Sequence, residues 1–155
     1  MNLKILWFVL ILIVIASSGV CSAQIIARDK AKSVESPNVA GTKSTAAYAE
    51  LLLRKTELQA DLESLILEYT EEYPKVKEIR FTLGLIQKES DRMFSVKFSD
   101  ASKFTLALGK LIVRKIELEI DLWGLLKNYN DGHPDVKRAK RKVEIYESAI
   151  REILG

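Results

Sequence analysis

The sequence predicts an all-α protein of two tandem αα-hairpins with coiled-coil-like helices, which either remain distinct or close into a four-helix bundle. Three observations support this prediction: apolar residues recur at heptad spacing, the chain repeats itself, and a proline divides each repeat in two. The 155 residues are 48% hydrophobic and 29% charged and include only 7 Gly and 3 Pro. This composition excludes a collagen-like chain and a wholly disordered one.

Residues 1–23 have the pattern of a signal peptide. Lys4 precedes an unbroken apolar run over residues 5–16, and the small residues Cys21 and Ala23 stand third and first before Gln24. Signal peptidase accepts only small side chains there, so we expect cleavage before Gln24 and export to a bacterial envelope, as a periplasmic or secreted protein. Two alternatives stay open: residues 5–21 are just long enough to remain as a membrane anchor, or Cys21 carries a lipid.

Cleavage removes Cys21, the one cysteine of the chain, so a disulfide framework is excluded for the mature protein. A packed apolar core must then stabilise it. Residues 24–43 lack helical or strand periodicity, and we interpret them as a flexible linker. The residues that favour turns or disorder in this segment are Ser33, Ser36, Pro37, Asn38 and Gly41.

From residue 44 onward the chain consists of two copies of one repeat unit, at 44–95 and 96–155. The copies align at a spacing of 60 residues without a gap, and 11 of 24 aligned positions, 54–77 against 114–137, are identical. The first copy's identical residues are Arg54, Lys55, Glu57, Leu58, Asp61, Leu62, Leu65, Tyr69, Pro74, Val76 and Lys77. We therefore expect the two units to fold in the same way.

Apolar residues in each unit follow the a and d positions of a heptad, which predicts two amphipathic helices per unit and no sheet. In the first unit they are Tyr48, Leu51, Leu58, Leu62, Leu65 and Tyr69, then Val76, Ile79, Leu83, Ile86 and Met93. In the second they are Leu108, Leu111, Leu118, Leu122, Leu125 and Tyr129, then Val136, Ala139, Val143, Tyr146, Ile150 and Ile153.

A hairpin turn divides each unit, at Tyr73 and Pro74 and again at His133 and Pro134. Proline inside a helix costs about 3 kcal/mol but suits the first turn of a new helix, so we expect helices to end near residues 71 and 131. Because the heptad phase continues across Pro74, a single kinked helix is the alternative in the first unit. Residues 95–102 would join the units, with Ser99 or Ser102 as the N-cap.

The first helix of the second unit carries an additional apolar stripe, formed by Ile112, Ile116, Ile120 and Trp123 beside the heptad seam. A wider stripe implies two packing partners. The second partner is either the other hairpin or another subunit.

We expect no enzymatic activity and no cofactor or metal, because the chain contains no GxSxG, GxGxxG, P-loop, HExxH or CxxC motif and only one His. That residue, His133, is replaced by Tyr73 in the first copy, so both are interpreted as aromatic covers of the turn. Carboxylates one helical turn apart, such as Glu57 and Asp61, could bind a cation or act as acid and base, but beside Arg54 they are better explained as flanking heptad charges.

Lys55 and Lys115 occupy the same core slot of the heptad in both copies. A polar residue there can specify register and oligomeric state at a cost in stability. The alternative is that each lysine lays its methylenes along the seam and carries its ammonium to water. In either case, replacing both by Leu is expected to raise thermal stability.

Five cations, Lys137, Arg138, Lys140, Arg141 and Lys142, form a basic run near the start of the last predicted helix. They are the candidate binding site for an acidic polysaccharide or an anionic lipid. The alternative is a solvated face that is partly paired with Glu144 and Glu147.

Charge is divided unevenly between the copies. Residues 44–95 hold 7 basic and 10 acidic side chains, a net charge of −3, whereas 96–155 hold 12 and 9, a net charge of +3. Complementary copies can pair within one chain or head to tail between chains. The net charge of the whole chain is only +3, which argues against a nucleic-acid partner.

The segment from Tyr129 to Val136, with Leu118, Leu122 and Leu125 upstream and heptads downstream, resembles the periplasmic helical hairpins of bacterial polysaccharide chain-length determinant and co-polymerase proteins. The segment from Tyr69 to Val76 is similar to a weaker copy of that motif. The likeness covers about 25 residues twice and implies a coiled-coil hairpin in the cell envelope. It does not extend to the second membrane span or the cytosolic kinase domain that such proteins carry.

These observations favour a non-enzymatic, exported envelope protein that acts as a structural or adaptor element through helix–helix contacts. Its partners would be other proteins or further copies of itself. The first alternative is a small periplasmic holdase chaperone or a module that binds an anionic ligand, such as an acidic glycan or a lipid headgroup. A second is a membrane-anchored accessory subunit, which requires that residues 1–23 stay attached.

Overall fold

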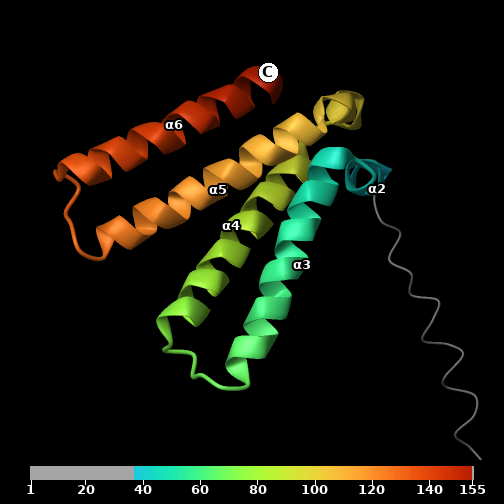
Figure 1. The fold of residues 1–155 in the computed structure, drawn as a ribbon. Coiled ribbons are helices and arrows are strands. Elements are labelled where there is room, and N and C mark those ends of the chain that lie inside the picture. Colours follow the sequence, from blue (N-terminus) through green and yellow to red (C-terminus); the bar gives the residue numbers. More distant parts are fainter. Residues whose placement is uncertain (1–36, 155) are drawn as a thin grey trace, which may run out of the picture. The chain divides into compact units, whose positions relative to one another are not determined.

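A computed structural model describes residues 37–154, and within this range the protein is all-α, with no strand (Figure 1). The elements are α2 (Pro37–Lys43), α3 (Ala46–Ile66), α4 (Pro74–Ser95), the 3-10 helix η2 (Phe98–Lys103), α5 (Leu106–Leu126) and α6 (Pro134–Leu154). Helices α3 and α4 form the first hairpin, and α5 and α6 form the second. The prediction of an all-α fold with two tandem hairpins is therefore confirmed.

The two hairpins begin and turn in the same way. The hydroxyl oxygens of Thr45 and Thr105 cap α3 and α5, each accepting a hydrogen bond at 3.3 Å from a backbone N–H three residues on. Pro74 and Pro134 stand at the first position of α4 and α6, where a missing N–H leaves no helical hydrogen bond unmade. The predicted proline positions are correct, but Ser99 and Ser102 are not N-caps, because they lie inside η2.

Helices α3 and α5 end at residues 66 and 126, five residues before the expected ends. Residues 67–73 and 127–133 form longer turns, so α3 and α4 are separate helices and not one kinked helix. The heptad assignment of Tyr69 and Tyr129 was wrong, since both lie in the turns and are exposed.

Aromatic stacking closes both turns. Tyr69 stacks on Tyr73 with ring centroids 4.2 Å apart, and Tyr129 stacks on His133 at 4.1 Å. The Nδ1 atom of His133 also accepts a hydrogen bond from the backbone N–H of Asp135 at 3.2 Å, which caps the start of α6. His133 thus covers and caps a turn, as its exchange for Tyr73 predicts.

Part of the expected flexible linker is structured. Residues 37–43 of the predicted 24–43 segment form α2, which packs against η2, α4 and α3 and buries Thr42. Tertiary contacts stabilise so short a helix, and it therefore needs no periodicity of its own. The predicted signal peptide, the cleavage site and the remainder of the linker lie outside the described residues.

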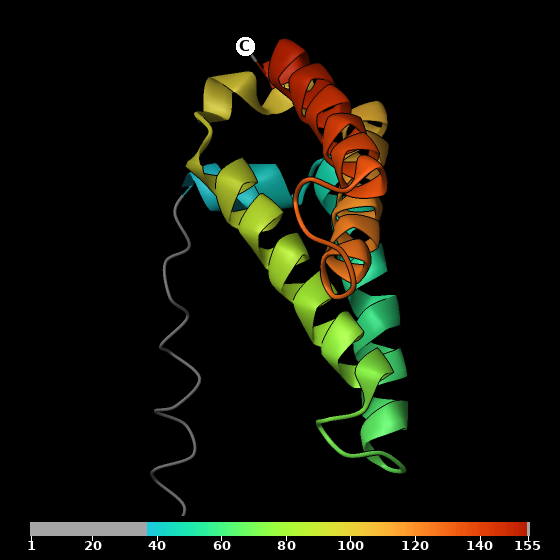
Figure 2. The same ribbon diagram turned by 90° about the vertical axis from the view of Figure 1, so that its left-hand side faces the viewer.

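Helix α5 joins the two hairpins, because it packs against α6 on one side and against α3 and α4 on the other. Helix α6 packs on α5 and η2 but not along α3, so the four helices do not close into a regular bundle. The hairpins approach at their open ends, and their turns lie apart (Figures 1 and 2). The main core accordingly lies near the crossing, where Leu51, Ile86, Leu108 and Ile112 are buried.

The second apolar stripe of α5 packs on the first hairpin of the same chain. Ile112 and Ile116 are buried there, and Trp123 stacks on Phe81 of α4 with ring centroids 4.8 Å apart. Leu122, the equivalent of the buried Leu62, is only half-buried.

The closest approach of the two hairpins is at Gly109 of α5. A Cβ at this position would lie 2.9 Å from the Cα of Ala47 and 2.9 Å from the Cβ of Glu50, both on α3. Next to this contact, the buried backbone N–H of Ala47 donates to the carbonyl of Phe104 at 3.2 Å. The crossing therefore requires glycine and fixes the two helices at backbone distance.

Candidate functional site

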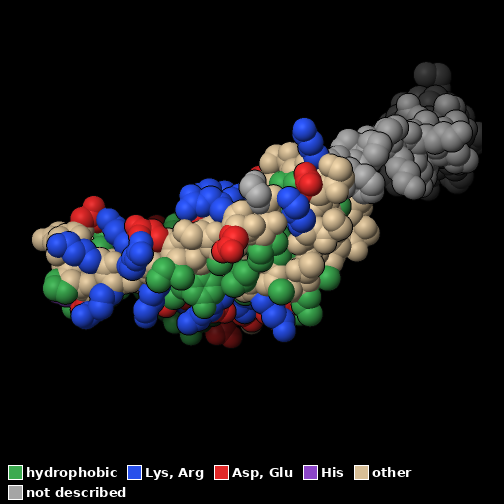
Figure 3. Space-filling view, turned by 90° about the horizontal axis from the view of Figure 1, so that it is seen from above, with side chains coloured by type: hydrophobic (Ala, Val, Ile, Leu, Met, Phe, Trp, Pro, Cys, Tyr) green, Lys and Arg blue, Asp and Glu red, His purple; other side chains and the backbone are tan. Residues whose placement is uncertain are grey.

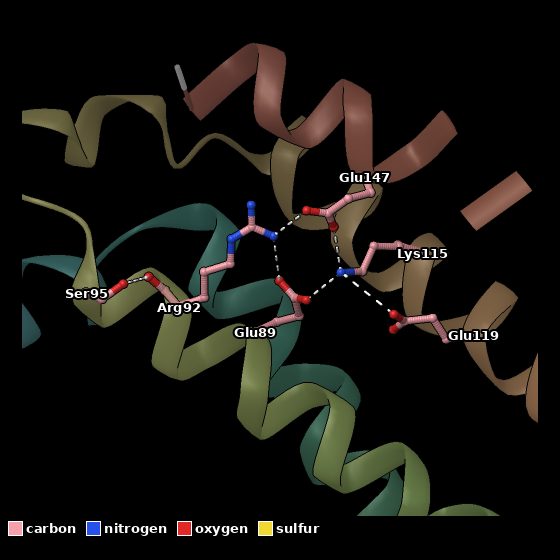
Figure 4. Close-up of polar contacts among 6 residues, drawn as sticks. All are labelled: Glu89, Arg92, Ser95, Lys115, Glu119 and Glu147. Carbon is pink, nitrogen blue, oxygen red and sulfur yellow. Dashed lines mark hydrogen bonds and ion pairs between the residues drawn. The ribbon is translucent and has the colours of Figure 1, made fainter. Parts of the chain in front are cut away.

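The most distinctive chemical feature is a buried cluster of charges where α4, α5 and α6 meet (Figure 4). We call it the ionic junction, and define it as Glu89 and Arg92 of α4, Lys115 and Glu119 of α5, and Glu147 of α6. Lys115 and Glu89 are each only 3% exposed. Charges buried to this degree must be paired, because leaving water is costly for an ion.

Lys115 is the centre of the ionic junction. Its Nζ donates to Glu89 Oε1 at 2.5 Å and to Glu147 Oε2 at 2.9 Å, and it lies 4.0 Å from Glu119 Oε1. Arg92 donates to the other oxygen of Glu147 at 2.9 Å and lies 3.8 Å from Glu89. One ammonium therefore connects three helices and both hairpins.

The ionic junction is an elaboration of a contact found in both copies. In the first hairpin, Lys55 Nζ donates to Gln87 Oε1 at 3.2 Å, and in the second Lys115 donates to Glu147. Gln87 and Glu147 are equivalent by the spacing of 60 residues. Each hairpin thus has a lysine that ties its first helix to its second at one register.

The two lysines differ in burial. Lys55 is half-buried, whereas the side chain of Lys115 is only 4% exposed and its ammonium is held by carboxylates. The expectation that Leu would be stabilising at both positions does not hold for Lys115, where substitution would leave Glu89 buried without its main partner.

The pKa values of Lys115 and Glu147 are shifted in opposite directions within the ionic junction. Burial alone would lower the pKa of Lys115, but hydrogen bonds to Glu89 and Glu147 outweigh it, so the pKa of Lys115 lies above its ordinary value. Burial would raise the pKa of Glu147, but hydrogen bonds from Lys115 and Arg92 hold it below its ordinary value. Lys115 and Glu147 therefore both stay charged at neutral pH.

Glu119 is the poorly compensated member of the ionic junction. Burial raises the pKa of this carboxyl, and the attraction of Lys115 offsets the effect only in part. Its contact with Lys115 is long, so at neutral pH its ionised form is held less favourably than in water.

A cleft of about 670 Å³ opens beside the ionic junction and is lined by its residues together with Lys88, Asp91 and Val143. The buried charges in its wall pair with one another across α4, α5 and α6. Among residues 37–154, no cluster of His, Cys, Asp or Glu has the composition of a metal site.

The basic run lies on the exposed side of α6, next to the α5–α6 turn, and Figure 3 shows Lys and Arg side chains gathered at that end of the molecule. Three of its members have acidic partners: Arg138 pairs with Asp135, Lys140 with Asp131 at 3.0 Å, and Arg141 with Glu144 at 3.1 Å. Lys137 and Lys142 have no acidic partner in the described part of the chain. Most of the run is therefore internally neutralised.

Sequence reasoning identified Lys115 but not the groups that surround it. Glu89 and Arg92 come from the other hairpin, so no spacing along the chain connects them to Lys115. Glu147 could have been found, because its equivalent in the first copy, Gln87, is also a hydrogen-bond acceptor.

Within residues 37–154, no helix has both the length and the apolar character needed to cross a bilayer. Comparison of the chain with protein-family models, with curated proteins and with solved structures finds no match.

Proposed function

We propose that this protein is a non-enzymatic, exported component of a bacterial envelope, which acts as a structural or adaptor element by binding other helices. The observation that supports this proposal is that large apolar side chains are exposed on the outer faces of the hairpins. Leu52 on α3 is 47% exposed, Leu67 after it is 85% exposed, and Ile145 on α6 is 54% exposed. Large exposed apolar side chains favour a protein-binding surface.

The interior of the protein suits such a role. The ionic junction and the glycine crossing at Gly109 hold two hairpins at one angle, so their outer faces keep a fixed geometry. A preorganised surface loses less conformational entropy when a partner binds. Export is inferred from residues 1–23, and fractionation of cells with intact mass measurement tests it.

The proposal is tested by capture of partners from an envelope extract with the purified chain as bait. The matched variants are Leu52→Gln with Leu67→Gln, which alter exposed apolar residues on α3 and directly after it, and Leu106→Gln, which alters an exposed apolar residue at the start of α5. We expect the first pair to lose partners that the wild type and Leu106→Gln retain. Equal capture by all three baits would contradict binding through the face of α3.

A second candidate function is binding of an anionic ligand, and Lys137 and Lys142 favour it because both are exposed and have no acidic partner among residues 37–154. Binding of acidic polysaccharide or of anionic lipid vesicles should then weaken steeply with salt, because exposed charges are screened within about 8 Å at physiological ionic strength. Changing Lys137 and Lys142 to Gln should abolish this binding and leave the core intact. Unchanged affinity of that variant would exclude the candidate.

A further inference from the structure

The contact between the two hairpins has two sides, and the internal repeat gives each side an equivalent position elsewhere on the molecule. On one side of the contact lies the second stripe of α5, where Gly109 meets the α3 backbone and Trp123 stacks on Phe81. On the other side lies the first hairpin, which contributes Ala47 and Glu50 from α3 and Phe81 from α4. Each side belongs to a repeat unit, and each therefore has an equivalent in the other copy.

The equivalent of the α5 stripe is one face of α3, which we call the open α3 face. The spacing of 60 residues places Ala49, Leu52, Thr56, Ala60 and Glu63 at the positions of Gly109, Ile112, Ile116, Ile120 and Trp123. Every one of these five α3 residues is exposed, whereas the α5 residues are buried or half-buried. Within the described residues, the first hairpin thus carries the equivalent helix face, with Leu52 as its large apolar residue, without a partner.

The equivalent of the receiving side lies on the second hairpin, and we call it the open α6 face. This face consists of Arg141 and Ile145 on α6 and Lys110 on the adjacent α5, which stand at the positions of Phe81, Leu85 and Glu50. Leu85 packs against the core, whereas Ile145 is 54% exposed. This face therefore also lacks a partner within the described residues.

We propose that the open α3 face of one chain docks on the open α6 face of a second copy, in the manner of the contact between the two hairpins. This inference rests on the proposed function and identifies its partner as another copy of the same chain. The substitutions between the two faces are complementary: where Phe81 stacks on Trp123 within the chain, Arg141 would meet Glu63 between chains. An apolar stack is replaced by an ion pair.

Charge on the wider surfaces favours the same pairing. The open α3 face lies on the unit with net charge −3, and the open α6 face lies on the unit with net charge +3. Since Leu52 and Ile145 are exposed at the two faces, docking would also bury apolar surface.

The contact between chains is looser than the contact within a chain. Gly109 allows its helix to touch the α3 backbone, but its equivalent, Ala49, adds a methyl group at that point. The helices must therefore lie slightly farther apart, which weakens association. Because the two faces differ, the contact is heterologous, and it extends to a ring or an open chain of subunits.

The test is sedimentation velocity over a range of concentrations, with the protein recovered from an export-competent host and its N-terminus checked by intact mass. Four proteins are compared: the wild type, Glu63→Arg, Arg141→Glu, and the double variant that carries both changes. Both residues are exposed, so far-UV circular dichroism should be the same for all four. Arg141→Gln serves as a milder variant, because it creates no repulsion with Glu144.

We expect the wild type to associate and each charge reversal to weaken association by about tenfold or more, while the double variant restores it to within about threefold of the wild type. Association that is indifferent to all the substitutions would overturn the proposal, because it would arise from another surface or from residues 1–23. A wild type that stays monomeric up to a concentration of about 1 mM would also overturn it, because the dissociation constant would then be too weak even for a transient contact. Capture of other proteins through the α3 face would then still support the proposed function, so the two failures are distinguishable.

Discussion

Replacement of Lys115 by Leu tests whether the ionic junction holds the hairpins together. The substitution removes two hydrogen bonds, to Glu89 at 2.5 Å and to Glu147 at 2.9 Å. Glu147 keeps Arg92 at 2.9 Å and remains satisfied. Glu89 is 3% exposed and keeps only the longer contact with Arg92 at 3.8 Å. The variant therefore leaves a buried carboxylate without its principal partner.

Loss of one partner from a buried ion pair destabilises a protein by about 3 to 5 kcal/mol. Two effects reduce this figure here: Arg92 still attracts Glu89, and the new Leu side chain buries apolar surface that Lys does not. We therefore expect Lys115→Leu to lower the free energy of unfolding by about 2 to 4 kcal/mol. The equivalent Lys55→Leu should change it by less than about 1 kcal/mol, because Lys55 is half-buried and its hydrogen bond is to a neutral glutamine.

Urea denaturation at neutral pH, followed by circular dichroism, measures both variants. The double variant Lys115→Leu with Glu89→Gln should recover much of the lost stability, since it removes the unpaired charge together with its partner. The reasoning fails if Lys115→Leu is as stable as the wild type, or if adding Glu89→Gln lowers the free energy of unfolding further. Either result would show that the burial of Glu89 does not depend on Lys115.

The packing and the charges lead to four further predictions. Gly109→Ala should lower the free energy of unfolding by about 1 to 3 kcal/mol, because its Cβ would lie 2.9 Å from the α3 backbone. Gly84→Ala, which has nothing within 4 Å, should raise it by up to about 1 kcal/mol. Chemical denaturation compares the two variants, and equal effects would contradict the close crossing. Leu62→Ala should cost about 2 to 5 kcal/mol, as core truncations do, and a change near zero by the same measurement would show that the α3–α4 seam is not packed. The pKa of Glu147 is lowered, so its stabilising contribution is present above its ordinary pKa of 4.5 and is lost as pH falls through the folded value; Glu147→Gln should therefore destabilise at pH 7, and the difference from wild type should shrink in acid. The pKa of Glu119 is raised, so its ionised form destabilises the folded protein at pH values above that pKa. Glu119→Gln should therefore raise the free energy of unfolding at pH 7, and this gain should vanish in acid. These assignments would be refuted if Glu147→Gln and Glu119→Gln changed the stability at pH 7 in the same direction.

The hairpins could be predicted from the sequence because local signals agree with one another. Heptad spacing orients the apolar faces, and Pro74 and Pro134 place the starts of the second helices. The caps at Thr45 and Thr105 were missed, although both threonines occur at the same repeat position. The repeat extends beyond its most similar stretch, and comparison of the copies at these flanking positions would have revealed them.

The angle between the hairpins could not be predicted, because it depends on contacts between residues far apart in the chain. Gly109 looks like a poor helix residue until the α3 backbone is placed against it. Leu122 has the same heptad position as Leu62, yet it is only half-buried, so an equal position in the repeat does not give equal burial. Likewise, heptad spacing identifies Lys115 as unusual, but only the fold brings Glu89 to it.

The most direct test of association through the hairpin faces is disulfide cross-linking between two different single-cysteine chains. In the contact between the two hairpins, a Cβ at Gly109 would lie 2.9 Å from the Cβ of Glu50, and the equivalent pair between chains is Ala49 and Lys110. With the slightly wider spacing that Ala49 requires, the Cβ atoms approach the separation of about 3.5 to 4.5 Å that a disulfide needs. One chain carries Ala49→Cys, the other carries Lys110→Cys, and both carry Cys21→Ser.

Mixed under mild oxidation, the two chains should form the mixed disulfide faster and in higher yield than Ala49→Cys does with a control chain that carries Lys97→Cys at an exposed loop position. Added Glu63→Arg on the first chain should suppress the cross-link, and Arg141→Glu on the second should restore it. A cross-link yield equal to that of the control pair would contradict head-to-tail docking of the open α3 face on the open α6 face.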